Sequence, residues 1–420
     1  MRHAWLAVPL LYLQPLFTHL ALTTLTETPL AFYGTLSTWL LLKNRPTASA
    51  AVIALAPITR YEAIVFLPVW AIALWRMRAA WWNYLLLIWA MLAYNLGAGL
   101  WLETLPINRF IEPAGSPHYG RGTWMTFVPK LAVACGPIVV ALAFMGAWRI
   151  LRRPFGWLCL LAPVSYFVAE TVVYRWGVYS SGGYSRFLVP LAGWLAVLAV
   201  AGIEPICLRR RRWLRLRALA VCGLLTAGLW VVSEIEWQLN PPEVAASWLP
   251  LVVPLRIALA GLCVLLAIPA LYVLARPRPE RLRPVGQFIF VTLLVALVLP
   301  AVWALIPLRL NPQQRIMRDT AAEFSCGGWD TSPMLAANLW MYYWTDRYRP
   351  QGQCDSWTAL AGAQPGTLFV WDARFCTDPD IAMPRGALAD KPEWQLLWTS
   401  PPRPGDSTAF LEVYKRIAGP

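Results

Sequence analysis

The chain has 420 residues, of which 58% are hydrophobic and only 14% are charged. Soluble domains carry roughly 25% charged residues, so this composition excludes an ordinary soluble protein. The formal net charge is +14, yet the whole surplus falls in residues 1–308, which hold 25 Lys and Arg against 10 Glu and no Asp. A basic surplus confined to a hydrophobic region is typical of cytoplasmic loops and argues against a nucleic-acid partner.

Hydrophobic segments follow one another through residues 1–308 and predict an α-helical polytopic membrane protein with about eleven transmembrane segments. Residues 309–420 have an ordinary composition and predict a small water-soluble α/β domain. The expected segments are Trp5 to Leu22, Pro29 to Leu42, Ser49 to Thr59, Ala63 to Trp75, Trp81 to Trp101, Met125 to Trp148, Trp157 to Val173, Phe187 to Ile206, Leu216 to Val232, Leu249 to Ala275 and Val285 to Leu308.

Basic residues gather in five alternate loops, which this segment order places on one side of the membrane. By the positive-inside rule that side is the cytoplasm, and an odd number of spans then leaves the C-terminal domain exoplasmic. The basic loops are Lys43 to Arg45, Arg76 to Arg78, Arg149 to Arg153, Arg209 to Arg217 and Arg276 to Arg283.

The stretch from Ser49 to Trp75 could form one long span or two short helices. One span would invert every later loop and move the Arg209 to Arg217 cluster outside, so the charges favour a hairpin of two half-length helices. Helices of about 11 residues reach only about 16 Å, so the tip at residues 59–62 lies at membrane depth. Charged groups are tolerated there beside protein or a water-filled cavity, which the hairpin therefore predicts.

Polar residues on the predicted outer face form three groups, around Glu27, around Arg60 and Glu62, and around Arg186. Arginine offers a planar fork that matches phosphate oxygens, so these groups predict a site for an anionic headgroup. Structural roles are also open. Arg60 could pair with Glu62 or Glu27 to brace the hairpin, Arg186 could anchor its span at the interface, and Glu27 could complement a helix dipole.

Two further outer loops carry residues that suit substrate binding. Residues 102–123 contain His118 and Arg121 and could cover a substrate, although a lone histidine is more often a surface residue. The loop with Tyr174, Trp176, Tyr179 and Tyr184 could stack on a sugar or form an interfacial aromatic belt. No close His, Cys and Asp spacing indicates a zinc site, and the sequence indicates no cofactor, while a divalent-metal requirement stays open.

Three stretches in order resemble the multi-spanning C-type glycosyltransferase superfamily. They are residues 22–30 (LTTLTETPL), 55–63 (LAPITRYEA) and 183–190 (GYSRFLVP). Each is weakly specific alone, and together they look like bacterial relatives of the dolichyl-phosphate-mannose protein mannosyltransferases and the aminoarabinose transferases. The resemblance implies an inverting enzyme of the bacterial inner membrane and cell envelope, with a polyprenyl-phosphate sugar donor and an exoplasmic active site.

On this resemblance Arg60 and Arg186 would bind the donor phosphate. Tyr61, Tyr184, His118 and Arg121 are the expected substrate-binding residues. The family carries its catalytic acidic residue, usually Asp, in a loop upstream of the region that matches residues 15–29. The chain starts too late for that loop, so we expect a product that lacks two N-terminal spans, a substitute carboxylate, or an inactive protein.

Glu27 and Glu62 are the candidate substitutes for the catalytic carboxylate, with Glu103 and Glu112 also open. The leading hypothesis is transfer of a sugar from a polyprenyl-phosphate donor to a lipid or protein acceptor on the exoplasmic face. A transporter or flippase, whose broken helices would line a pathway, is the main alternative. A non-catalytic membrane subunit is the third.

The C-terminal region predicts helices at Gln314 to Phe324 and Pro333 to Tyr343. Strands are expected at Thr367 to Asp372, Trp394 to Thr399 and Ala409 to Lys415. Three exoplasmic cysteines, Cys326, Cys354 and Cys376, allow one disulfide without fixing the pair. Asp372, Asp378 and Asp380 could form a metal site but are more typical of a solvated loop.

Overall fold

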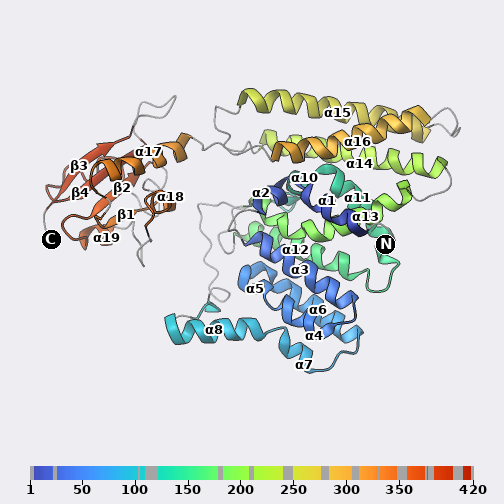
Figure 1. Cartoon of the computed structure of the whole chain (residues 1–420), viewed down its shortest axis with the longest axis horizontal. Helices are drawn as coiled ribbons and strands as arrows, with labels where there is room; N and C mark the ends of the chain where they lie inside the picture. The colour runs from blue at the N-terminus through green and yellow to red at the C-terminus, as the bar shows by residue number, and fades with distance from the viewer. Residues whose placement is uncertain are drawn as a thin grey trace. The chain divides into compact units, whose positions relative to one another are not determined.

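The computed structural model divides into two compact units, residues 1–243 with 250–307 and residues 244–249 with 308–420. It describes residues 4–21, 26–102, 105–108, 122–177, 183–207, 212–239, 249–275, 283–304, 312–329, 331–347, 357–373, 376, 383–400 and 410–417. The first unit is helical and the second contains a β-sheet (Figure 1).

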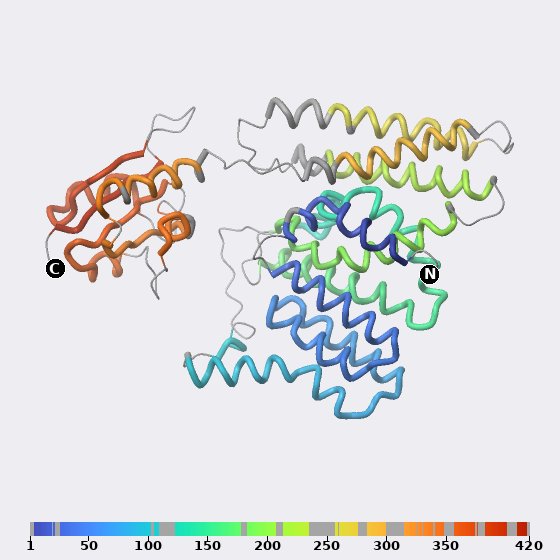
Figure 2. Tube along the Cα trace, viewed as in Figure 1, coloured from blue at the N-terminus to red at the C-terminus, as the bar shows by residue number. Residues whose placement is uncertain are grey.

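The first unit is a bundle of helices (Figures 1 and 2). It has one large apolar core and a smaller apolar cluster made by Phe17, Leu20, Ala31, Val189 and Ala192. Its elements are η1 (Ala4–Leu6), α1 (Ala7–Tyr12), α2 (Pro15–Leu20), α3 (Glu27–Leu42), α4 (Pro46–Ile53), α5 (Ala56–Thr59), η2 (Tyr61–Val65), α6 (Phe66–Arg76), α7 (Trp82–Leu86), α8 (Trp89–Leu102), α10 (Phe127–Cys135), α11 (Pro137–Leu151), α12 (Leu158–Trp176), η5 (Ser185–Leu191), α13 (Ala192–Cys207), α14 (Arg212–Leu239), α15 (Leu249–Ala275) and α16 (Arg283–Ala304).

Three helices of the described chain are long and apolar enough to cross a membrane, namely Leu158–Trp176, Ser185–Ile206 and Trp213–Glu234. The bent pair Phe127–Cys135 and Pro137–Leu151 makes a fourth if it forms one span. The prediction of a mainly helical chain with several apolar helices is therefore confirmed, while the count of eleven spans stays a prediction.

Several expected spans are interrupted, and the sequence around each break explains why. The helix expected from Met125 to Trp148 bends by 106° between α10 and α11. Gly136 there has φ +83°, which favours glycine, and Pro137 starts the next helix because it lacks an N–H to continue the first. Pro15 likewise separates α1 from α2 after Gln14, which adopts the extended backbone that precedes proline.

The predicted pair of short helices in residues 49–75 is present. Helices α4 and α5 lead into Arg60, whose backbone is extended (φ −150°, ψ 132°), and η2 and α6 lead away from it. Polar contacts join this hairpin to α3, where the Ser37 and Ser49 hydroxyls lie 2.9 Å apart and the Trp70 indole N–H donates to Ser49 Oγ at 2.9 Å. Such side-chain hydrogen bonds stabilise helix pairs where water is absent.

Close backbone packing joins α11 to α13. A Cβ on Gly146 would meet the Leu198 carbonyl oxygen, and a Cβ on Gly202 would meet that of Leu142. Small residues let membrane helices approach in this way. This pairing fixes the position of α13, the helix that continues from the Arg186 segment.

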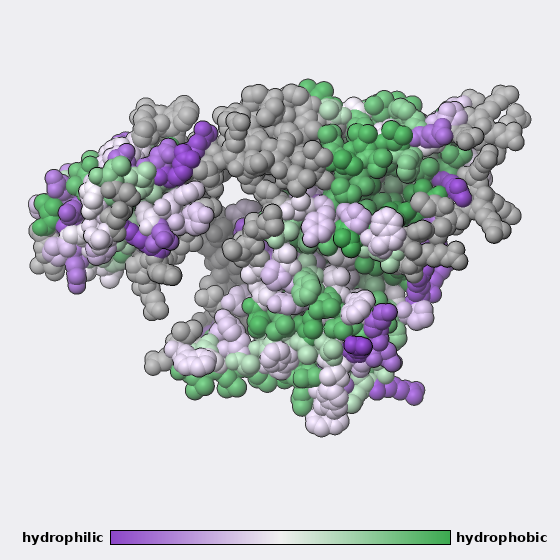
Figure 3. Space-filling view, viewed as in Figure 1, coloured by the Kyte–Doolittle hydropathy of each residue, from purple (hydrophilic) through white to green (hydrophobic). Residues whose placement is uncertain are grey.

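The predicted polar site and the described basic residues Lys43 and Arg76 lie at opposite ends of helices α3 and α6. Helices α3, α6 and α13 each begin near the site residues, and the first two end at the exposed Lys43 and Arg76. Figure 3 shows hydrophilic side chains along the right-hand edge of the helical unit and broad hydrophobic areas along its helices.

The second unit is a four-stranded mixed sheet covered by helices on its two faces. Strand order is β1-β2-β4-β3, with β1 parallel to β2 and the other pairs antiparallel. Met317 of α17 and Met341 of α18 pack on one face, and Leu360 of α19 packs on the other. The elements are α17 (Pro312–Cys326), β1 (Met334–Ala336), α18 (Leu339–Trp344), α19 (Trp357–Ala361), β2 (Leu368–Asp372), β3 (Trp394–Thr399) and β4 (Leu411–Arg416).

The three expected strands are present as β2, β3 and β4, and the first expected helix as α17. The helix expected from Pro333 to Tyr343 is wrong in its first half, because Met334 to Ala336 pair with β2 as a strand before α18 begins. Cys326 is an exposed free cysteine and Cys376 is buried. Cys354, Asp378 and Asp380 lie outside the described residues, so the disulfide stays a prediction.

Candidate functional site

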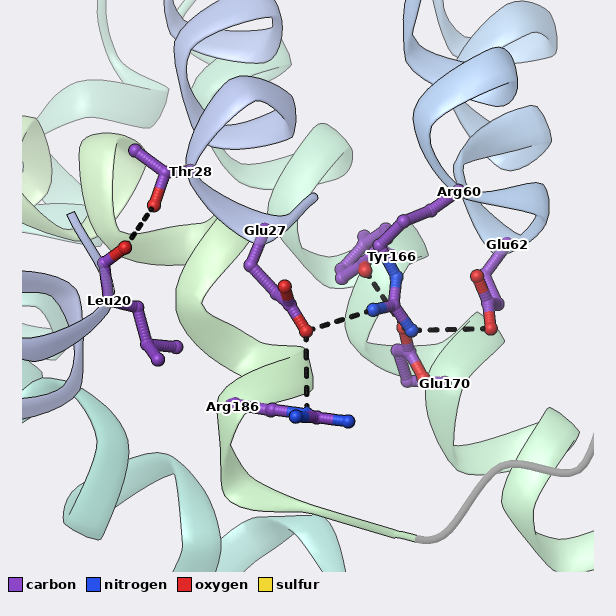
Figure 4. A network of polar contacts seen from close by, with 8 residues as sticks. All are labelled: Leu20, Glu27, Thr28, Arg60, Glu62, Tyr166, Glu170 and Arg186. Atoms are coloured by element: carbon purple, nitrogen blue, oxygen red, sulfur yellow. Dashed lines mark hydrogen bonds and ion pairs between the residues drawn. The ribbon is translucent and has the colours of Figure 1, made fainter. Parts of the chain in front are cut away.

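Arg60 lies at the centre of a cluster of charged side chains (Figure 4). Its guanidinium donates to Glu27 Oε1 at 3.1 Å and to Glu62 Oε1 at 3.4 Å, and lies 3.6 Å from Glu170 Oε1. The same group stacks on the Phe187 ring at 4.3 Å. Only 11% of the Arg60 side chain is exposed, so most of its surface is already used by these partners.

Glu27 is the first residue of α3 and turns its carboxylate toward the two arginines. Both ion pairs considered for Arg60, with Glu27 and with Glu62, are present. The negative charge at the start of α3 also suits the helix dipole. The structural and functional interpretations of Glu27 are therefore compatible, because the same carboxylate lies at the start of α3 and pairs with the arginines.

Arg186, at the start of η5, is the accessible cation of the cluster. Its side chain is 43% exposed, and its Nε lies 3.6 Å from Glu27 Oε1, beyond hydrogen-bond distance. The guanidinium lies over the rings of Tyr184 at 5.1 Å and Phe187 at 5.5 Å. These contacts orient the guanidinium while one side stays open to a ligand.

Glu170 and Tyr166 belong to the cluster and were missed by the sequence analysis. Glu170 is fully buried, and its Oε1 accepts a hydrogen bond from the Tyr166 hydroxyl at 2.8 Å. Tyr166 is itself held by stacking on Phe66, with ring centroids 5.5 Å apart. A signal existed, because Glu170 is the one carboxylate in the apolar span from Trp157 to Val173, where a charge by default suggests a functional site.

The cluster has three carboxyl groups against two guanidinium groups, in a largely buried place. Four of its polar atoms are buried and have no hydrogen-bond partner among the described residues: Glu27 Oε2, Arg60 Nε, Glu170 Oε2 and Arg186 Nε. Unsatisfied buried groups are costly, and most proteins keep few of them. Such a cluster is poorly explained by stability alone and is typical of a binding or catalytic site.

Tyr174 fixes the segment that leads into Arg186. Its ring packs against Gly122 and Gly183, where an added Cβ would clash with ring atoms. Lys130 donates to the Gly183 carbonyl at 2.7 Å, and Gly183 has φ +60°. Tyr174 therefore supports the polypeptide chain, which differs from the exposed stacking platform considered for it.

The remaining predicted site residues are only partly described. Tyr184 is 47% exposed beside Arg186, and Tyr61 is half-buried at the start of η2. His118, Arg121, Glu103 and Glu112 lie outside the described residues, so their roles stay predictions. Within the described ranges, no three His, Cys, Asp or Glu side chains are grouped so as to hold a metal ion.

Comparison with known proteins finds a solved structure with a similar fold. No family profile and no curated sequence matches the chain. The crystal structure of ArnT from Cupriavidus metallidurans bound to undecaprenyl phosphate is similar, with a TM-score of 0.56 and 16% identity over 97% of this chain and 78% of that chain. The resemblance to the C-type glycosyltransferases is therefore confirmed at the level of the fold.

Proposed function

We propose that the protein is a membrane glycosyltransferase that moves a sugar from a polyprenyl-phosphate donor to a lipid or protein acceptor. The observation that supports this proposal most directly is the accessible Arg186 guanidinium, which lies beside buried carboxylates that lack some of their hydrogen-bond partners among the described residues. A second support is the fold, which is shared with a protein whose structure holds undecaprenyl phosphate. We place the reaction at the exoplasmic face of a bacterial inner membrane, with the C-terminal unit on the same side.

In this proposal Arg186 binds the donor phosphate through its exposed guanidinium. Arg60 is enclosed by three carboxylates and adds positive charge from beneath while it holds Glu27 and Glu62 in place. Arginine is suited to both tasks because its planar fork stays charged and binds oxygen pairs. Tyr184, exposed beside Arg186, is the described aromatic residue placed to contact the sugar.

The reaction then needs a proton acceptor and a stabilised leaving group. The acceptor hydroxyl attacks the anomeric carbon, its proton passes to a carboxylate, and the bond from that carbon to the phosphate oxygen breaks. The phosphate leaves with the electron pair, and Arg186 stabilises its charge. Glu27 is the preferred base because it lies beside Arg186, and Glu62 is the alternative.

An apolar cavity of about 290 Å³ supports a lipid-linked donor. Residues of α10 to α14 and η5 line it, including Val140, Phe144, Phe167, Leu195 and Leu229. Every residue that lines the cavity is apolar, which suits a prenyl chain and does not suit a charged headgroup. This cavity could receive part of a prenyl chain.

Binding of undecaprenyl phosphate by the purified full chain in detergent tests the proposal. We expect Arg186→Ala to weaken binding by at least about 30-fold, because a charged partner of the phosphate is lost. Arg152→Ala removes an equal charge from an exposed position over the Trp148 ring and should leave binding unchanged. Equal affinity of Arg186→Ala and the wild type would exclude the proposed phosphate site.

Transfer itself needs a separate assay, with a labelled polyprenyl-phosphate sugar and membrane lipids or proteins as acceptors. Glu27→Gln should abolish most transfer, because the amide cannot take the acceptor proton. Unchanged transfer by Glu27→Gln, with loss in Glu62→Gln, would assign the base to Glu62.

A further inference from the structure

Glu27 shares one carboxylate oxygen between two arginines. Its Oε1 accepts from Arg60 at 3.1 Å and lies 3.6 Å from Arg186 Nε, while its Oε2 is buried without a hydrogen-bond partner among the described residues (Figure 4). The first contact is a hydrogen bond and the second is a longer ion pair. The contact of Glu27 with Arg186 is therefore weaker than its contact with Arg60.

The two arginines differ in what they would lose if Glu27 moved. Arg60 has Glu62 and Glu170 as further partners and is largely buried. Arg186 is 43% exposed, and Glu27 is the carboxylate that the described residues place within ion-pair distance of it. An incoming anion can reach Arg186 and compete with Glu27 there, while Arg60 retains the Glu27 side chain.

We propose that Glu27 occupies, when no donor is bound, the position on Arg186 that a lipid-linked phosphate takes when it binds. This inference rests on the proposed function and concerns the order of events within the site. The donor phosphate displaces Glu27 from Arg186 and leaves it bound to Arg60. Glu27 thereby becomes available as the base when the donor is present.

The chemistry of the exchange favours the phosphate. A phosphate can present two oxygens to the arginine fork, whereas Glu27 offers Arg186 one oxygen at 3.6 Å without a hydrogen bond, so the phosphate forms the better hydrogen-bonded pair. Glu27 then loses one of its two cations and gains a negative neighbour.

Because Glu27 competes with the phosphate for Arg186, removing its charge should increase the affinity for undecaprenyl phosphate. A purely structural role of Glu27 would not produce such an increase. Glu27→Gln removes the internal competitor, so undecaprenyl phosphate should bind about tenfold tighter, less than the full Coulomb energy because Arg186 is exposed. Glu204→Gln is the matched control, because Glu204 pairs with Arg149 and Arg153 and belongs to no part of the Arg60 cluster, so it should change binding by less than about twofold. In the Arg186→Ala background, Glu27→Gln should give no gain.

Three probes identify the part of the lipid that is recognised. Undecaprenyl phosphate tests the whole ligand, inorganic phosphate tests the headgroup, and undecaprenol tests the chain without the charge. We expect Glu27→Gln to tighten binding of the two phosphate probes and to leave undecaprenol unchanged. An equal gain with undecaprenol would overturn the proposal, since the chain carries no charge for Glu27 to compete with.

The outcomes separate this inference from the proposed function. If the wild type binds undecaprenyl phosphate and Arg186→Ala does not, the function stands; equal or weaker binding by Glu27→Gln then overturns the inference alone. If the wild type does not bind undecaprenyl phosphate, both fail. Should Glu27→Gln not fold, Glu27→Asp keeps the charge on a side chain one methylene shorter, and tighter binding by about threefold is expected as its carboxylate retracts from Arg186.

Discussion

The helical unit and the C-terminal unit treat buried polar groups differently. In the C-terminal unit the buried Asp372 accepts from Asn338 at 2.7 Å, and Arg416 donates to the Leu360 carbonyl at 2.7 Å. In the helical unit, the Arg60 cluster alone contributes four of the eight buried polar side-chain atoms that lack a partner among the described residues. The buried polar groups of the C-terminal unit are paired and stabilise its fold, whereas those of the Arg60 cluster are only partly paired, as the proposed binding site requires.

The largest expected effect is the loss of Arg60 itself. Arg60→Ala leaves three carboxylates close together with one cation, and should destabilise the helical unit by about 3–5 kcal/mol. Arg60→Lys keeps the positive charge without the planar guanidinium, so it should destabilise the helical unit less than Arg60→Ala. The rate at which a thiol dye labels the buried Cys135 and Cys159 on heating measures this, with exposed Cys326 as the internal reference. If Arg60→Ala showed the same thiol-labelling transition temperature as the wild type, the central role of Arg60 would be contradicted.

A change in the C-terminal unit should affect stability and nothing else. Asn338→Ala removes a donor from the buried Asp372 and should cost about 1–3 kcal/mol. Limited proteolysis of the full chain would show faster cleavage in residues 308–420, with the thiol-labelling transition of the helical unit unchanged. Gln395→Ala, at an exposed position of β3, is the control. Loss of undecaprenyl phosphate binding in Asn338→Ala would show that the two units are coupled.

Tyr414 should give the C-terminal unit an alkaline limit. Burial, together with its hydrogen bond to Glu412 at 2.6 Å and the charge of Glu412, raises the pKa of Tyr414 well above the usual value of about 10. The unfolded chain therefore loses the Tyr414 proton at a lower pH than the folded chain. The contribution of Tyr414 to stability is complete below about pH 10 and is lost as pH rises through the folded-state pKa. Proteolysis between pH 8 and 11 should show a steeper loss of resistance in the wild type than in Tyr414→Phe.

The smallest effect on stability is expected at Glu170, although it is fully buried. Glu170→Gln keeps the shape and the acceptor for Tyr166 and removes the excess negative charge, so stability should change by less than about 0.5 kcal/mol or rise. The thiol-labelling transition measures this, and Thr171→Ala on the same helix turn is the control. A loss of several kcal/mol would show that the charge of Glu170 is already compensated and would weaken the contrast between the two units.

The sequence alone determined the class of protein and part of the site. Hydropathy and charge are local properties, so they identified the helical region, the basic loops, the hairpin broken at Arg60 and the strands β2 to β4. They also selected Glu27, Arg60, Glu62 and Arg186, because charges bordering apolar segments stand out in composition. The bend at Gly136 and Pro137 was readable in principle from those two residues.

Tertiary structure decided how these residues meet. Glu170 and Tyr166 enter the cluster only because α12 packs against η2, more than 100 positions earlier in the chain. The difference between an enclosed Arg60 and an accessible Arg186 depends in the same way on packing, through Phe187 beneath both guanidinium groups. Burial and partner number are properties of the folded environment, so no local pattern could show which arginine remained open to a ligand.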